Sequence, residues 1–242
     1  MHTFWKTIGL YNSATWLGQL LIVVTGIILT TLLIRKQSPT VKRLMKIYLT
    51  GVYLWIAIVY YLIYCAERNY NALMALFWGV MAIAWIWDTV TGYTTFEYNK
   101  KYRVFACFLL LSPFMYPLFS LLRGLSYPEI TSPVMPCSVV TFTLGLLLLY
   151  SRKVNIFMVL LLCHWSLIGL AKTYFFQIPE DFILVSVSIP ALYLFFNESF
   201  IRNLPKDAKP KAKYIHGLLI LICVMLGAVL VSSLLQTAFA YP

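Results

Sequence analysis

Eight apolar runs fill most of this sequence, and each is bounded by charged, polar or proline residues. A helix that crosses the hydrocarbon core of a bilayer, roughly 30 Å thick, needs about 20 predominantly apolar residues in a row. Hydrophobic residues make up 61% of the chain and charged residues 11%, whereas soluble domains carry about 25% charged residues. The sequence therefore predicts an all-α fold, a polytopic transmembrane helical bundle with about eight spans.

The predicted spans divide the chain into a seven-span body, a linker and a last helix. Their boundaries are 14–34, 46–66, 71–92, 103–122, 136–151, 155–175, 181–196 and 215–236. We expect 1–242 to form a single integral membrane domain, with the seven-span body in 1–200. Residues 203–214 hold four lysines and two prolines and are predicted to be a basic cytoplasmic linker. This linker leads to a C-terminal transmembrane helix over 215–236.

Lysine and arginine residues gather on one side of the predicted bundle. Fifteen of the 19 lie in or beside the loops that follow the first, third, fifth and seventh spans: Arg35, Lys36, Lys42, Arg43, Lys46, Lys100, Lys101, Arg103, Arg152, Lys153, Arg202, Lys206, Lys209, Lys211 and Lys213. Because basic residues are retained on the cytoplasmic side of a membrane, both termini are predicted to be extracytoplasmic. Topology therefore explains the net charge of +11, and no nucleic-acid partner is predicted.

Prolines interrupt the region before the fifth predicted span. Pro128 and Pro133 keep the segment out of a helix, and Pro136 takes the first helical position, where its missing N–H is tolerated. The helix from Pro136 to Ser151 would be about 24 Å long, too short to cross a core of roughly 30 Å. We therefore expect the proline loop to dip below the outer interface, where it must be buried in protein or line a wet cavity.

Three short motifs occur in an order that resembles a known family. They are Tyr11-Asn12-Ser13-Ala14-Thr15-Trp16 with Gln19, Pro136-Cys137 followed by Phe142-Thr143-Leu144-Gly145, and Trp165 and Gly169 followed by Pro179-Glu180-Asp181. Their combination resembles an uncharacterised bacterial polytopic membrane protein family, domain of unknown function 6064. The resemblance runs through the first seven spans and implies a multi-pass protein of the bacterial inner membrane. It implies no particular chemistry, and the cofactor stays unknown.

Cys137 is the first candidate site residue, because it lies in the first turn of a helix. The unpaired N–H groups and dipole there favour an anion and raise the reactivity of a thiol. Met135 and Cys137 are both soft ligands, suited to copper(I) or mercury(II). The alternative is that Cys137 is a small buried residue at a tight junction. Cys65 also lies near the outer face and could pair with Cys137, but the sequence does not show whether the two are close.

Four further polar residues are candidates for ligand binding. His164, near the middle of its span, could relay protons or contact a ligand, or could hydrogen-bond to a neighbouring helix. Lys172 lies two turns further out and could border the same cavity or extend to the outer interface. Thr141 could bind a ligand or could form an interhelical hydrogen bond. Asp88, close to the cytoplasmic end of its span, could pair with a basic cytoplasmic loop or act as an ion or proton stop.

Three functions remain open at this point. The preferred one is a small transporter or permease for a small molecule or ion, with a site opening to the outer face, because broken helices with exposed termini hold substrates in many transporters. The second is a membrane-embedded thiol- or metal-handling enzyme that uses Cys137, although no paired acid or catalytic motif supports it. The third is a structural or assembly subunit of a membrane complex, whose apolar spans dock a partner. For any of the three, the lipid bilayer is an expected partner and a homo-oligomer is an option.

Overall fold

The computed structural model describes residues 2–66, 71–150, 155–176 and 179–197. These residues hold seven α-helices and no β-strand, which confirms the all-α prediction. The helices are α1 (His2–Arg35), α2 (Pro39–Trp55), α3 (Asn71–Thr91), α4 (Arg103–Leu122), α5 (Pro136–Tyr150), α6 (Ile156–Phe176) and α7 (Phe182–Phe196). A π-helix, η1 (Ile56–Tyr64), continues α2, and the 3-10 turns η2 (Lys100–Tyr102) and η3 (Pro179–Asp181) precede α4 and α7. The predicted linker 203–214 and helix 215–236 lie outside the described residues.

Four of these helical segments are long and apolar enough to cross a membrane, namely Phe4–Arg35, Pro39–Tyr64, Asn71–Thr91 and Lys100–Leu122. The described parts of α5, α6 and α7 form shorter apolar helices. Large apolar side chains also cover the outside of the bundle: Leu21 is 69% exposed and Leu76 is 65% exposed. Such an apolar exterior fits a surface that faces lipid rather than water.

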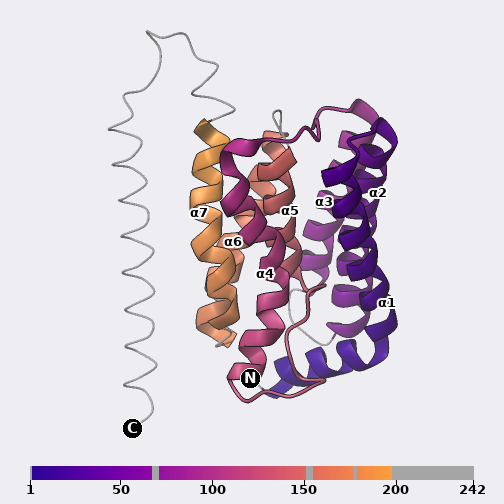
Figure 1. Ribbon diagram of the computed structural model, residues 1–242. Helices are drawn as coiled ribbons and strands as arrows, with labels where there is room; N and C mark the ends of the chain where they lie inside the picture. The colour runs from indigo at the N-terminus through magenta and orange to yellow at the C-terminus, as the bar shows by residue number, and fades with distance from the viewer. Residues whose placement is uncertain (1, 67–70, 151–154, 177–178, 198–242) are drawn as a thin grey trace.

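The helices are arranged around α5. In Figure 1, α1, α2 and α3 lie on one side of the bundle, and α4, α6 and α7 lie around α5 on the other. Helix α5 packs against α4, α6 and α7, and 14 of its 15 residues are buried, all except Phe142. The first turns of α1 run across the lower end of the bundle, where α4 ends. The opposite, upper end is the one where α2 begins and α3 ends.

Gly145 allows α4 and α5 to cross at short range. A Cβ atom at this position would lie 2.9 Å from Leu109 Cβ and 2.9 Å from the backbone nitrogen of Leu110. Small residues at such crossings let helix backbones approach closely, which is how membrane helices gain packing contacts. Gly145 therefore permits the short distance between α4 and α5.

The proline loop between α4 and α5 has the predicted form. Helix α5 begins at Pro136, and Thr131 and Val134 before it are buried. Asn12 of α1 satisfies the loop backbone: its Nδ2 donates to the carbonyl oxygens of Pro128 (2.8 Å) and Ile130 (2.7 Å). Ser132 and Met135 are also buried, whereas Tyr127 and Glu129 are exposed, so only the half of the loop next to α5 is mostly buried in protein. The expected dip of the loop below the outer interface stays a prediction.

Helix α2 begins earlier than predicted. Its first residue is Pro39 instead of residue 46, and Ser38 caps it in an extended conformation, accepting a hydrogen bond from the Val41 N–H at 3.3 Å. A serine cap followed by proline at the first position is a recognised start signal for a helix. Lys42 and Lys46 consequently lie on the helix and not in the preceding loop.

Candidate functional site

A buried ion pair joins α2 and α3 near the upper end of the bundle. Lys46 Nζ lies 2.8 Å from Asp88 Oδ2, and the side chains are 7% and 1% exposed. Lys46 lies seven residues after Pro39, about 10 Å along the helix at 1.5 Å per residue. Charges buried in a bundle whose helices are long and apolar enough to cross a membrane are expensive and are by default candidates for function.

Lys46 binds the end of α3 in two ways. Besides the carboxylate, its Nζ donates to the main-chain carbonyl oxygen of Asp88 at 3.0 Å. Asp88 lies three residues before the end of α3, where the helix dipole disfavours a negative charge, and its carbonyl oxygen also accepts the Gly92 N–H at 2.9 Å. The ammonium group of Lys46 compensates for the negative charge, so the carboxylate is tolerated where it would otherwise destabilise the helix.

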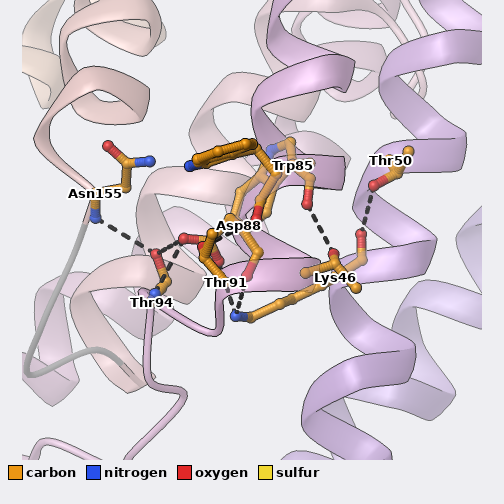
Figure 2. A network of polar contacts seen from close by, with 9 residues as sticks. Lys46, Thr50, Trp85, Asp88, Thr91, Thr94 and Asn155 are labelled. Carbon is orange, nitrogen blue, oxygen red and sulfur yellow. Dashed lines mark hydrogen bonds and ion pairs between the residues drawn. The ribbon is translucent and has the colours of Figure 1, made fainter.

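The loop after α3 completes this network, which Figure 2 shows from close by. Asp88 Oδ1 accepts hydrogen bonds from the Thr94 backbone N–H at 3.0 Å and from Thr94 Oγ1 at 2.8 Å. The backbone N–H of Asn155, just before α6, donates to Thr94 Oγ1 at 3.4 Å. The network therefore connects α2, α3, the α3–α4 loop and the start of α6 through one carboxylate.

A polar cavity of about 480 Å³ borders the ion pair. It lies between the first turns of α2 and the end of α3 with its following loop, and its lining carries three basic side chains and one acid. The lining residues are Pro39, Lys42, Arg43, Lys46, Thr89, Val90, Gly92, Thr94, Thr95, Phe96 and Glu97. We call this space the upper vestibule, and with a basic excess and threonine hydroxyl groups it can accommodate an anion.

A second charged network closes the lower end. Arg123 Nη1 donates to both carboxylate oxygens of Glu180, each at 2.9 Å, and the Glu180 side chain is fully buried. Ser120 Oγ also donates to Glu180 Oε1 at 2.9 Å and lies 2.8 Å from Thr131 Oγ1 in the proline loop. The Trp5 ring lies 5.8 Å from the Arg123 guanidinium carbon. This network binds α1, α4, the proline loop and the turn before α7 together.

Met135 and Cys137 lie together, as a shared site requires. Both line a cavity of about 30 Å³ near the lower end, which Tyr116 and Asp181 also border. A cavity of that size has room for a water molecule and not for an organic substrate. Cys65 and Cys137 are each present as buried thiols.

His164 does not line the cavity that Met135 and Cys137 share. Its imidazole is exposed on the outside of α6, 5.7 Å from the Phe77 ring, and borders a surface depression with Ser188 of α7. Lys172 belongs to α6, but its side chain is outside the described part of the structure. Thr141 is buried in α5 and donates to the Ser138 carbonyl oxygen at 2.8 Å. The cavity beside Cys137 and the depression beside His164 have no lining residue in common, and ligand binding by any of these residues stays a prediction.

Among the described residues, no group of three or more His, Cys, Asp or Glu side chains is close enough to hold a metal ion. Two residues that form ion pairs, Lys46 and Arg123, were not among the site residues predicted from the sequence. Lys46 was assigned to a loop because the predicted start of the second span was too late. The Ser38-Pro39 pair was the signal that could have corrected this.

Comparison with known proteins identifies the family. No curated protein and no solved structure matches the chain. A family model does match it, over residues 1–206, and this range includes every described helix. The model confirms the resemblance carried by the motifs around Asn12, Cys137 and Trp165. The chain therefore belongs to the family of unknown function DUF6064.

Proposed function

We propose that the protein is a small multi-pass transporter of the permease type that moves an anionic solute across the bacterial inner membrane. The observation that carries the proposal is the buried Lys46–Asp88 pair in the wall of the upper vestibule. An ion pair below a polar cavity, inside an otherwise apolar bundle, is the arrangement expected of a solute pathway. The solute site then lies at the upper end, not at the outer face that the sequence favoured.

The charge and size of the vestibule support an anionic solute. Lys42, Arg43 and Lys46 line it against the one lining acid Glu97, and after Lys46 has compensated the Asp88 carboxylate an excess of one positive charge remains. Its volume of about 480 Å³ lies within the roughly 300–1,000 Å³ typical of small-molecule sites. A small anion with one or two negative charges suits this lining.

Lys46 is suited to act as a switch in this pathway. An ammonium group has three N–H donors, and the carboxylate and carbonyl of Asp88 engage two of them. An anion in the vestibule competes with Asp88 for Lys46. Once Lys46 turns to the solute, the ion pair between α2 and α3 is broken, and the hydrogen bonds from Thr94 are left to hold the Asp88 carboxylate. Binding of the solute thereby favours opening of the upper end.

Transport assays in proteoliposomes test this function. We expect protein-dependent uptake of at least one of radiolabelled phosphate, sulfate and acetate, and loss of that uptake in Lys46→Met. The matched control is Lys36→Met, because Lys36 is exposed at the same end and does not line the vestibule. Uptake equal to that of empty liposomes for all three anions, or wild-type uptake by a folded Lys46→Met protein, would contradict the proposal.

The proposed topology has eight spans, with the vestibule facing the cytoplasm and both termini outside. It rests on the excess of Lys and Arg at the upper end and in the sequence after residue 200. A reporter that is active only outside the cytoplasm, fused after Pro242, is expected to be active. The same reporter inserted between Lys36 and Gln37 is expected to be silent, and the reverse pattern would invert the topology.

A structural role is the second candidate, and the packing of α5 favours it. Its one incompletely buried residue is Phe142, so the described bundle has a dense centre. If the protein only supports a membrane complex, Lys46→Met should lower stability without changing any flux. The transport assay therefore separates the two candidates.

A further inference from the structure

An apolar groove of about 200 Å³ opens on the side of the bundle and has no lining residue in common with the upper vestibule. Its walls come from α1, α2, α4, the end of the proline loop and α5, and most of its lining side chains are aliphatic or aromatic. The lining residues are Ile22, Val23, Gly26, Ile27, Thr30, Thr31, Tyr48, Leu49, Val52, Leu110, Leu111, Pro113, Phe114, Pro133, Val134, Val139 and Phe142.

Two features of the chain keep this groove open. Gly26 lies directly against Tyr48: a Cβ on Gly26 would come 2.5 Å from the Tyr48 hydroxyl oxygen, which donates to the Ile22 carbonyl at 3.0 Å. On the opposite wall, Pro113 lies within α4, and prolines bend helices because they lack an N–H and clash with the preceding turn. The shape of the groove is therefore specified by α1, α2 and α4 and is not a packing defect.

The depth of the groove places it in hydrocarbon. Its α1 wall, Ile22 to Thr31, extends about 14 Å and ends four residues, about 6 Å, below Arg35. Its rim consists of exposed apolar residues: Ile27 is 51% exposed and Leu111 is 63% exposed. In a membrane this rim faces acyl chains, and an empty apolar space would forfeit the dispersion contacts of its walls.

We infer that the groove holds one acyl chain of a phospholipid from the leaflet at the upper end. Arg35, one turn above Thr31 on the same face of α1, is exposed and lies where the phosphate of that lipid would be. The chain would reach Phe142, the residue of α5 that is not buried. A bound chain thereby extends the packing of α1 to the central helix. This site is independent of the proposed transport function.

Photochemical cross-linking tests this inference. The protein is reconstituted in vesicles of phosphatidylglycerol that carries a diazirine in the middle of one acyl chain, and the labelled residues are mapped by mass spectrometry. We expect label on α5 at Phe142, in addition to label on outward residues such as Leu21. Lipid that merely surrounds the protein reaches Leu21 and does not reach α5, because α5 is otherwise buried.

Variants that block the groove provide the control. Ile27→Trp and Leu111→Trp place a large ring at the two rims and are expected to abolish the label on Phe142. Ile28→Trp is the matched control: Ile28 is 52% exposed, beside Ile27, but does not line the groove. Two outcomes overturn the inference: α5 unlabelled in the wild type, or Phe142 label unchanged in both rim variants. A second protein copy in the groove would give the first outcome together with a dimer in light scattering.

Discussion

The two ends of the bundle each hold a buried acid paired with a base, yet the surroundings of the two pairs differ. At the lower end, Glu180 is fully buried and receives hydrogen bonds from Arg123 and Ser120, while Asn12 fixes the proline loop beside it. At the upper end, Lys46 and Asp88 border a cavity of about 480 Å³. The lower acid is enclosed by protein although its partner Arg123 is 35% exposed, whereas the upper pair, 7% and 1% exposed, adjoins the upper vestibule. From this difference we expect a lower end that is held by more hydrogen bonds and an upper end that can rearrange.

The largest expected effect is at the lower end. Arg123→Met leaves the carboxylate of Glu180 buried without its cation, and breaking a buried pair in this way typically costs about 3–5 kcal/mol of unfolding free energy. Chemical denaturation in detergent micelles measures the loss. The control is Lys6→Met, because Lys6 is exposed near the same end. Adding Glu180→Gln to Arg123→Met should restore part of the stability, and no restoration would show that the charge was not the cause.

A smaller loss of stability, with loss of transport, is expected at the upper end. Lys46→Met should lower the unfolding free energy by about 2–3 kcal/mol, because Asp88 keeps both hydrogen bonds from Thr94 and water in the vestibule can approach it. The same denaturation assay measures this change. If Lys46→Met proves more damaging to stability than Arg123→Met, the proposed difference between the two ends is wrong.

The proline loop gives the third prediction. Asn12→Ala removes two hydrogen bonds to loop carbonyl groups, at 2.8 and 2.7 Å, and should lower the unfolding free energy by about 1–2 kcal/mol. Ser13→Ala is the matched control, because Ser13 is exposed and donates only to the Gly9 carbonyl of its own helix. Equal stability of the two variants would mean that the loop is held by other contacts.

The smallest expected effect concerns the α3–α4 loop. Thr94→Val removes the hydroxyl donor to Asp88 but keeps the backbone N–H, so the loss should be about 1 kcal/mol. Thr95→Val is the control in the neighbouring position. Faster hydrogen exchange of the residue 92–97 amides in Thr94→Val, without faster exchange in the proline loop, would localise the effect to the upper end. Faster exchange in both regions would contradict the expectation that the two ends of the bundle rearrange independently.

Residues with strong local signals were predicted correctly from the sequence. Pro136 begins α5 because proline is favoured at the first helical position, and the predicted spans 71–92, 103–122 and 181–196 match α3, α4 and α7 to within one residue. Apolar runs and prolines act over a few residues, so a single sequence reveals them. The start of α2 was missed although Ser38 and Pro39 carried a signal of the same local kind.

The side of each helix that faces inward could not be predicted in the same way. In lipid, the outer face of a helix is as apolar as its inner face, so the sequence of α6 does not reveal that His164 points outward. The partners of Asp88 and Glu180 could also not be predicted from the sequence. Lys46 and Arg123 lie 42 and 57 residues from them in the sequence, and only the packing of the helices brings each pair together.

The hydrogen bonds of Asn12 also bear on the order in which the protein is made. Asn12 is synthesised early, but its partners Pro128 and Ile130 follow 116 and 118 residues later. The first turns of α1 can therefore dock on the loop only after α1 to α4 and the loop itself have been synthesised. A ribosome-arrested chain ending before the loop should accordingly expose the N-terminal turns to protease, whereas a chain released after α5 should protect them. The N-terminal turns are thus expected to form their tertiary contacts late in biogenesis, although they are the first part of the chain to emerge.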